Sequence, residues 1–451
     1  MVSPVSGGDS AARAAALEAL LHVDRGVRDE LHAFFDRAAL SRRDRALATQ
    51  LAAGAVRHRR TLRLILQHVR GRDAREVQTP LREILELGAF QLLFLDRVPP
   101  YAAIHEAVEA ARRSAAGKGG AKATGFVNGM LRGVQRLVAG RDPAGRPAPD
   151  ALPHPEGGVV RLRAAVLPDP QSDRAAFLGA AYSYPDWLVV RWLEVFGDAA
   201  EDVCRWGNRR PRLFARIHPQ KSSDPFFAEV APGPRPGCVD VTAVPMERLE
   251  ALLADGTLSI QDPAAMAAVE ALAPAPGETV LDLCASPGTK TTQIVEALGG
   301  QGRVVACDRS EEKLEPLRRT VASRGLVNVT VCPADEAESA APTGGFDAAL
   351  VDAPCSNTGV LARRPEVRWR IQPSDLDELA AIQGGLLARA AGLVRPGGRM
   401  VYSTCSLEAE ENDGVVSGFL KSNAAWHLIR RDLLLPAADH DGAFWAWLAK
   451  R

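Results

Sequence analysis

The pattern that most constrains this chain is a regular alternation of short apolar runs and helical stretches from about Thr257 onward. Runs typical of buried strands occupy residues 279–284, 303–307, 329–331, 348–351 and 399–403. Helical patterns separate them at residues 289–298, around Leu314 and Leu317, and at residues 376–394. This alternation predicts a doubly wound, Rossmann-like α/β domain with a parallel sheet.

Two cysteines follow strands of this predicted sheet. Cys355 lies just after the run 348–351, and Cys405 lies just after Met400-Val401-Tyr402. Ligands of an open parallel sheet bind in the crevice beyond the carboxyl ends of its strands. Two thiols at that edge, one of them beside the carboxylate of Asp352, indicate chemistry more than packing.

The loop after the first strand predicts a nucleoside-binding site. It contains a tight turn at Gly288, yet it matches neither the GxxxxGK[ST] nor the GxGxxG pattern. Asp308 ends the second strand 20 positions later, where a carboxylate accepts hydrogen bonds from both ribose hydroxyls. A cofactor with a nucleoside but no pyrophosphate, S-adenosylmethionine, fits this pattern best. Asp335, after the third strand, lies near the adenine or is an ordinary loop aspartate.

The residues around the two cysteines favour methylation of a pyrimidine carbon. A thiolate that adds to C6 of cytosine makes C5 nucleophilic enough to take a methyl group, and a carboxylic acid near N3 stabilises the charge in the ring. Asp352 and the two thiols supply these elements. Amino-directed methyltransferases carry Asn/Asp-Pro-Pro-aromatic after this strand, whereas residues 352–355 read Asp-Ala-Pro-Cys. The residues alone do not decide which cysteine attacks.

The rest of the chain is expected to form three further parts. The sequence predicts helices at residues 11–23, 44–56, 80–93 and 102–111, without strand-like alternation. The expected organisation is an all-α domain at residues 1–140, a Pro- and Gly-rich linker at 141–180, a small α+β RNA-binding module at 181–260, and the methyltransferase domain at 261–451. In the third part, Arg209, Arg210, Arg212 and Arg216 surround a short predicted strand that either follows a phosphate backbone or forms a solvated sheet face.

Composition limits the partners and the compartment. The net charge is zero, but residues 1–140 hold 22 Lys and Arg against 14 Asp and Glu. This local excess fits an RNA-binding surface or a solvated helical surface equally well. Seven cysteines without CxxC spacing argue against disulfides and a metal site and for a reducing cytoplasm. The sequence shows neither signal-peptide features nor an apolar stretch of about 20 residues, so we expect a cytoplasmic protein without a membrane partner.

The first part of the chain resembles a known RNA-binding domain. Residues 45–48, 54–57, 87–94 and 126–132 look like the corresponding segments of the NusB-type helical domain. That domain occurs alone as an RNA-binding antitermination factor and also at the front of some RNA methyltransferases. Taken singly, Leu87, Phe90 and Leu93 have the spacing of ordinary core residues.

The second part carries a closer resemblance. Residues 282–292, 352–359, 403–406 and 410–412 look like the motifs of the Sun/Nop2-type RNA cytosine-5 methyltransferases. With the NusB-like front, nearly the full length resembles the Sun (Fmu) branch, which methylates a cytosine in bacterial small-subunit (16S) ribosomal RNA. The resemblance implies that Cys405 is the nucleophile, that Cys355 assists product release, and that Lys290 and Asp352 face the base. The implied cofactor-binding residues are Cys284, Ala285, Ser286, Pro287, Gly288, Thr289, Lys290, Asp308, Asp335 and Asp352.

Departures from the family pattern are small. Ser286 and Thr289 replace the commoner Ala and Gly, and Asn357 replaces a small residue. We further expect Arg363, Arg364 and Arg368 to grip RNA, with Trp369 either stacking on a base or packing in the core. The other five cysteines, Cys204, Cys238, Cys284, Cys307 and Cys332, are expected to be packing residues.

The expected protein is a monomer that acts on small-subunit ribosomal RNA. Two alternatives stay open at this point. One is an RNA chaperone or antitermination factor with a vestigial transferase domain. The other is the same enzyme with transfer RNA as its substrate.

Overall fold

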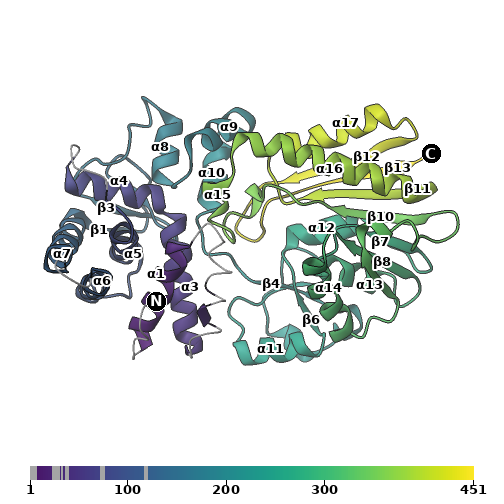
Figure 1. The fold of residues 1–451 in the computed structure, drawn as a ribbon, viewed down its shortest axis with the longest axis horizontal. Helices are drawn as coiled ribbons and strands as arrows, with labels where there is room; N and C mark the ends of the chain where they lie inside the picture. The colour runs from purple at the N-terminus through teal and green to yellow at the C-terminus, as the bar shows by residue number, and fades with distance from the viewer. Residues whose placement is uncertain (1–7, 23–30, 32–33, 36–39, 72–76, 116–119) are drawn as a thin grey trace. The chain divides into compact units, whose positions relative to one another are not determined.

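The computed structural model describes residues 8–22, 31, 34–35, 40–71, 77–115 and 120–451, and these fall into two compact units (Figure 1). One, here called the helical unit, takes the described residues up to Arg210 together with Leu361–Arg370. The other, here called the α/β unit, takes Pro211–Val360 and Ile371–Arg451. Among the described residues no helix is long and apolar enough to cross a membrane.

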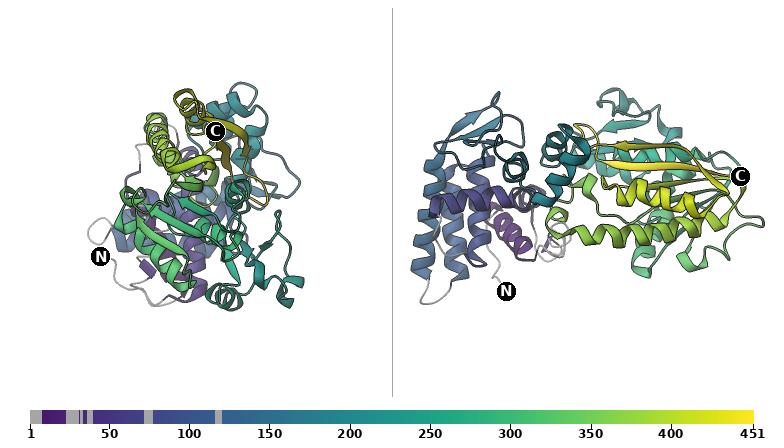
Figure 2. Two further views of the ribbon diagram at one scale, coloured as in Figure 1. Left: turned by 90° about the vertical axis from the view of Figure 1, so that its right-hand side faces the viewer. Right: turned by 90° about the horizontal axis from the view of Figure 1, so that it is seen from above.

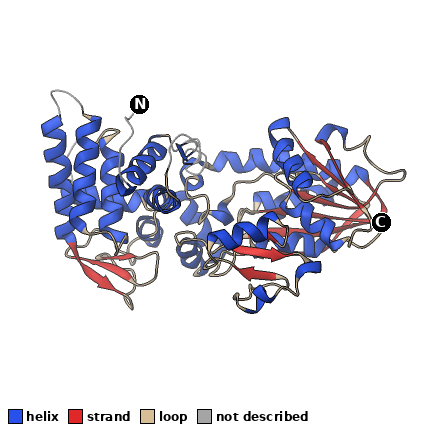
Figure 3. Ribbon diagram, turned by 90° about the horizontal axis from the view of Figure 1, so that it is seen from below, coloured by secondary structure: helices blue, strands red, loops and turns tan. Residues whose placement is uncertain are grey.

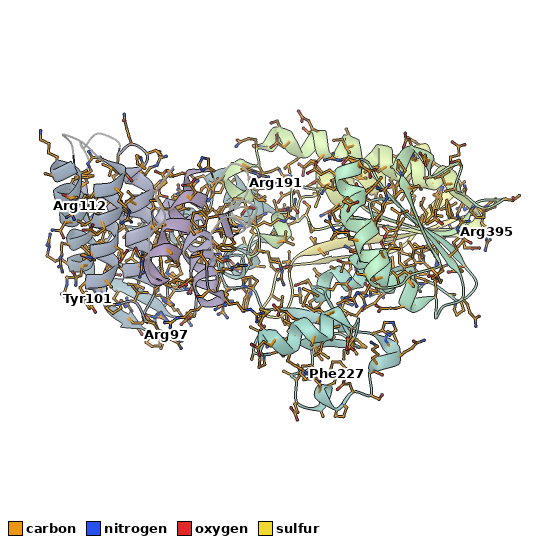
Figure 4. The ribbon with its side chains drawn as sticks, turned by 60° about the horizontal axis from the view of Figure 1, so that its bottom comes forward. Arg97, Tyr101, Arg112, Arg191, Phe227 and Arg395 are labelled. Atoms are coloured by element: carbon orange, nitrogen blue, oxygen red, sulfur yellow. The ribbon has the colours of Figure 1, made fainter. Side chains whose placement is uncertain are left out.

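The N-terminal part of the helical unit is all helical, as the sequence predicts. Ser41 opens one of its helices by accepting a hydrogen bond from the backbone N–H of Asp44, and Pro80 directly precedes another. The helices are α1 (Gly8–Leu21), α3 (Arg42–Arg57), α4 (Arg59–Arg70), α5 (Leu81–Phe94), α6 (Pro100–Ser114) and α7 (Gly120–Leu137). Exposed side chains such as Arg97, Tyr101 and Arg112 project from this part (Figure 4).

The predicted linker at residues 141–180 is wrong. This region forms a three-stranded antiparallel sheet with the order β1-β3-β2, followed by a helix. The elements are β1 (Val138–Asp142), β2 (Ala151–Pro153), β3 (Val159–Leu162) and α8 (Arg174–Ala181). Ala151, Leu152 and Val159 are fully buried. The strands are only three to five residues long, too short for a visible alternation, and the Pro and Gly residues that indicated a linker lie mostly in the turns between them.

The predicted start of the small module at residue 181 is also wrong. Helices α9 (Asp186–Phe196) and α10 (Ala199–Trp206) belong to the helical unit, with Trp192 and Tyr184 buried edge to face. The module itself is a separate three-stranded antiparallel sheet in the α/β unit, with the order β5-β4-β6. It contains β4 (Phe214–Ile217), β5 (Cys238–Asp240), α11 (Met246–Ala254) and β6 (Leu258–Ile260).

One arginine of the basic strand is an internal residue. Arg216 on β4 is 5% exposed, and its guanidinium lies 2.8 Å from Glu296 and 3.0 Å from the hydroxyl of Thr292. Arg212 pairs with the buried Asp240. Both charges are therefore compensated within the α/β unit. The side chain of Arg216 faces neither solvent nor a phosphate backbone.

The large sheet of the α/β unit has seven strands in the order β12-β13-β11-β10-β7-β8-β9 (Figure 3). The predicted strands pair in parallel, but β13 pairs antiparallel with β11 and β12. The sheet is therefore mixed. The strands are β7 (Thr279–Asp282), β8 (Arg303–Asp308), β9 (Val329–Pro333), β10 (Phe346–Asp352), β11 (Val394–Thr404), β12 (Trp426–Leu434) and β13 (Ala443–Lys450).

Helices cover both faces of this sheet (Figure 2). One face packs on α12 (Pro263–Leu272), α13 (Thr289–Ala297) and α14 (Glu311–Ser323). The other packs on α16 (Pro373–Leu393) and α17 (Val415–Ser422). The two apolar cores between these layers hold the sheet rigid, so that residues at its carboxyl edge keep fixed positions.

Residues 361–370 leave the α/β unit and belong to the helical unit, and this overturns one expectation about RNA contacts. The guanidinium of Arg368, in α15 (Val367–Arg370), is fully buried and 3.9 Å from the ring centroid of Tyr184. It donates to the backbone carbonyls of Arg57, Tyr182, Ser183 and Gly207 and to the side chain of Asn208. The guanidinium of Arg368 therefore binds backbone carbonyls of the protein itself and not RNA.

The other candidate residues of this segment are predicted to contact RNA or, for Trp369, to pack in the core. Trp369 donates its indole N–H to the carbonyl of Val56 at 2.9 Å, which favours the packing alternative. Arg363 and Arg364 are exposed and stay candidates for RNA contact.

We predict that Arg368→Met destabilises the helical unit. The substitution keeps the apolar stem but leaves several buried carbonyls without a donor, at about 1–3 kcal/mol for each unpaired group. Differential scanning calorimetry should show a lower unfolding midpoint for the helical unit. The matched control is Arg364→Met, an exposed change expected to stay within about 0.5 kcal/mol of the parent. Equal midpoints for the two variants would contradict this account of Arg368.

Candidate active site

The two predicted thiols meet at the carboxyl edge of the large sheet. Strands β10 and β11 are parallel neighbours, and their last paired residues are Asp352 and Ser403. The turns that follow therefore start side by side. They bring the Sγ atoms of Cys355 and Cys405 to 3.1 Å from each other.

Asp352 lies at the centre of this edge and has two polar partners. One carboxylate oxygen is 2.6 Å from Nζ of Lys290, and the other accepts a hydrogen bond of 2.7 Å from the hydroxyl of Ser403. Burial disfavours the ammonium of Lys290, but the neighbouring carboxylate outweighs burial and raises the pKa of Lys290. The ammonium of Lys290 is therefore paired with the carboxyl group of Asp352, whose side chain is one third exposed.

The loop after β7 has the shape that the sequence predicts. Gly288 adopts a left-handed conformation with φ +105°, and a Cβ atom there would come within about 3.0 Å of Thr320. The backbone N–H of Ser286 donates to the carboxylate of Asp308 at 3.0 Å, which joins the loop to the end of β8. Thr289 and Lys290 then begin α13.

These residues suit the nucleoside end of S-adenosylmethionine. Asp308 ends β8 and is almost buried, while Asp335 is exposed on a single 3-10 turn just after β9, the next strand of the sheet. The two carboxylates thus follow neighbouring strand ends beside the glycine turn. Cys284 lies half-buried in the loop, and burial raises the pKa of its thiol.

Some of these residues line a small cavity and others do not. It measures about 130 Å³, and Lys290, Asp352 and Cys405 line it. Cys355 and the loop 284–288 are not among its lining residues. Its other walls come from α12, from the ends of β10 and β11 and from the loop before β13, and include Asp262, Asp441 and Trp445. The cavity therefore gives one of the two cysteines direct access to a small ligand.

The surroundings of Cys355 disfavour its thiolate form. The hydrogen bond with Cys405, burial, and the nearby charges of Cys405 and Glu411 raise the pKa of Cys355 well above its ordinary value. Cys355 therefore keeps its proton near neutral pH. Asn357, in a left-handed conformation that asparagine tolerates, donates to the carbonyl of Cys355 and accepts from the thiol of Cys405 at 3.3 Å. This links the departure at position 357 to the backbone of Cys355 and to the thiol of Cys405.

Sequence reasoning did not single out Asp282 as a site residue. This last residue of β7 is fully buried and accepts a hydrogen bond of 2.7 Å from Thr291. Burial, reinforced by the charge of Asp352, raises the pKa of Asp282 to about 7. The sequence shows Asp282 only as one residue of a motif. Its burial could not be predicted because it depends on how α13 packs against β7.

A second group of residues also went unassigned. Glu411, Asn412 and Gln383 are buried behind the two cysteine turns. The segment 410–412 was visible as a motif, but nothing in the sequence pointed to Gln383. The remaining cysteines Cys204, Cys238, Cys307 and Cys332 are buried, as expected of packing residues.

Both the N-terminal helices and the α/β unit match known protein families. Residues 269–442 match the model of the 16S rRNA methyltransferase RsmB/F family, and residues 10–136 match that of the NusB family. Among solved structures, the crystal structure of PH0851 covers 99% of this chain and 100% of its own, with a TM-score of 0.74 at 22% identity. NSun6 from Pyrococcus horikoshii, solved with SFG, covers 60% of this chain and 99% of its own, with a TM-score of 0.51 at 19% identity.

Curated relatives extend the match to most of the length. The probable ribosomal RNA small subunit methyltransferase B of Synechocystis is 34% identical over 86% of this chain and 83% of its own. That of Bacillus subtilis is 32% identical over 85% and 81%, and the methyltransferase B of Serratia proteamaculans is 30% identical over 91% and 92%. The chain therefore belongs to the RsmB/F family of 16S rRNA methyltransferases, and it is an enzyme that uses S-adenosylmethionine.

Proposed function

We propose that the enzyme methylates C5 of a cytosine in small-subunit ribosomal RNA through a covalent bond between Cys405 and C6 of the base. The observation that carries this proposal is the cavity that Cys405, Asp352 and Lys290 line together. A nucleophile, a carboxyl group and an ammonium around one small cavity are the groups that addition to a pyrimidine ring requires.

Access and protonation support Cys405 as the nucleophile. Cys405 lines the cavity, whereas Cys355 does not. The raised pKa of Cys355 keeps that residue a neutral thiol, and the thiolate is the nucleophilic form. Both arguments support Cys405 as the attacking residue, a choice that the residues of the sequence alone left open.

The reaction can be written around these residues. The thiolate of Cys405 forms a bond to C6, and the Asp352 carboxyl near N3, held by Lys290 and Ser403, stabilises the charge that enters the ring. S-Adenosylmethionine supplies the methyl group that C5 takes. Transfer of the C5 proton to water then restores the C5–C6 double bond and expels the sulfur of Cys405 as a thiolate. Cys355, 3.1 Å from the Cys405 sulfur, lies beside the bond that breaks, and its thiol assists this release by donating a hydrogen bond to the departing thiolate.

The substrate class rests on the relatives and on the domain composition. The matched relatives are named as ribosomal RNA small subunit methyltransferases B, and the NusB-like helices supply a second RNA-binding part. Bisulfite mapping of ribosomal RNA from a strain that lacks the protein should reveal one cytosine that is no longer methylated. An unchanged ribosomal map together with a lost transfer-RNA modification would favour the alternative substrate.

Replacement of each cysteine should have a different effect. Cys405→Ala should abolish methyl transfer because no thiolate reaches C6. Cys355→Ala should accumulate a covalent RNA–protein adduct, because the bond forms but is not released. The adduct is measured as a band of reduced mobility in denaturing gel electrophoresis. Full turnover without an adduct in Cys355→Ala would contradict the role of that residue.

The two thiols should also differ in the absence of RNA. At pH 7–8, iodoacetamide should alkylate Cys405 before Cys355, because alkylation requires the thiolate and Cys355 keeps its proton. Mass spectrometry of the parent protein measures both sites at once. The parent is required because removing Cys405 removes the main cause of the raised pKa of Cys355. Faster modification of Cys355 would contradict the assignment.

Asp308→Ala should weaken binding of S-adenosylmethionine about 10- to 100-fold, because two hydrogen bonds to a charged acceptor are lost. Isothermal titration calorimetry measures the affinity, and Asp439→Ala is the matched control, since Asp439 is a half-exposed carboxylate in the loop between β12 and β13. Binding by the parent protein also argues against a vestigial transferase domain. Equal affinities of Asp308→Ala and the parent would contradict the role of Asp308.

A further inference from the structure

A single buried turn lies behind both cysteines. Residues Glu410–Gly414 form a π-helical turn that leads from the second cysteine turn into α17. π-Helical turns are rare and occur frequently at functional sites. The side chain of Glu411 in this turn is fully buried, and Asn412 is 3% exposed.

Glu411 contacts the residue that follows each cysteine. Its Oε1 atom accepts a hydrogen bond of 2.8 Å from the backbone N–H of Ser356, and its Oε2 atom accepts one from the hydroxyl of Ser406. The hydroxyls of Ser356 and Ser406 are themselves 2.9 Å apart. One carboxyl group thus connects the two turns directly.

Asn412 and Gln383 contact the residue that precedes each cysteine. Asn412 accepts from the hydroxyl of Thr404 at 2.6 Å and donates to the carbonyl of Ser406 at 2.9 Å. Gln383 on α16 donates to the carbonyl of Pro354 and to Oε1 of Glu411, both at 2.9 Å. Residues on both sides of Cys355 and of Cys405 are therefore tied to the same turn.

We propose that Glu411 is a positioning residue that sets the separation and orientation of the two thiols. This inference rests on the proposed function, because it assigns the residue to the bond-forming and bond-breaking steps at those thiols. The carboxyl group of Glu411 forms no hydrogen bond with either sulfur. It acts through Ser356 and Ser406.

A buried carboxyl group suits this task better than an apolar side chain would. A buried polar group is expensive unless all its partners are present, so a satisfied network is stable in one arrangement only. An apolar residue of similar size would fill the space but would not hold the backbone N–H of Ser356. The geometry of the pair would then depend on the flexibility of two loops. A displacement of about 1 Å at a reacting group can lower the rate about 100-fold.

Three variants separate positioning from general stability. Glu411→Ala removes every contact of the carboxyl group. Glu411→Gln is the conservative variant, because its amide oxygen can still accept from Ser356 and its NH₂ group can donate to the hydroxyl of Ser406. Asp413→Asn is the matched control. It removes a carboxylate from the same turn, but one that is half exposed and pairs with Arg431 at the surface.

The first readout needs neither RNA nor cofactor. The oxidant diamide removes the two thiol hydrogens and joins Cys355 to Cys405 as a disulfide, at a rate that depends on how the sulfurs face each other. Peptide mass spectrometry distinguishes this disulfide from one between Cys307 and Cys332, whose sulfurs are 3.3 Å apart. We expect the parent, Glu411→Gln and Asp413→Asn to form the Cys355–Cys405 disulfide at similar rates and Glu411→Ala at least 10-fold more slowly. A parent-like rate in Glu411→Ala would overturn the proposal.

The second readout is the methyl-transfer reaction. For Glu411→Ala we expect kcat to fall about 100-fold while the Kd for S-adenosylmethionine stays unchanged, because the residues that hold the cofactor lie on other loops. Glu411→Gln should recover most of kcat. Loss of cofactor binding along with kcat would indicate a general structural defect and would overturn the positioning role. If the parent methylates no cytosine, the proposed function fails, whereas the diamide result still decides whether Glu411 positions the thiols.

Discussion

The active site depends on the parallel pairing of two strands. Because β10 and β11 are neighbours whose last paired residues are Asp352 and Ser403, the chain leaves both strands at the same level of the same edge. A shift of one residue would turn the side chains of one strand to the opposite face and separate the groups around Asp352. The apolar layers on both faces prevent such a shift, so the hydrophobic core indirectly sets the distance between two thiols.

Several buried polar groups around this edge are held by partners from distant parts of the chain. Lys290 and Asp352 are 62 positions apart, and Glu411 joins two turns that are 50 positions apart. Arg368 does the same in the helical unit, where it donates to several carbonyls. Such groups are expensive to bury alone and are therefore stable only in the complete fold. The residues of the site therefore take up their positions only when the whole domain folds.

The sequence predicted the α/β domain well because its signals are local. Apolar runs identify the strands, and a glycine turn with a carboxylate 20 positions later predicts a nucleoside site, without knowledge of any long-range contact. It failed where the local signal was weak or misleading. The strands of the sheet β1-β3-β2 are too short to show a period. In the edge strand β12, apolar pairs flank three consecutive charged residues, Arg430, Arg431 and Asp432, so no alternation indicates it.

By itself, then, the sequence determined the order of strands and helices, the residues at the strand ends and, through its motifs, the family. Tertiary structure alone decided which of two similar cysteines lines a cavity and which carboxyl group holds both cysteine turns. It also decided that Arg368 is buried while Arg363 and Arg364 are exposed. The physical reason is that period and composition encode the faces of elements, whereas protonation, access and hydrogen-bond partners depend on what other elements pack against them. An arginine that binds backbone carbonyls and one that binds RNA look the same in a sequence.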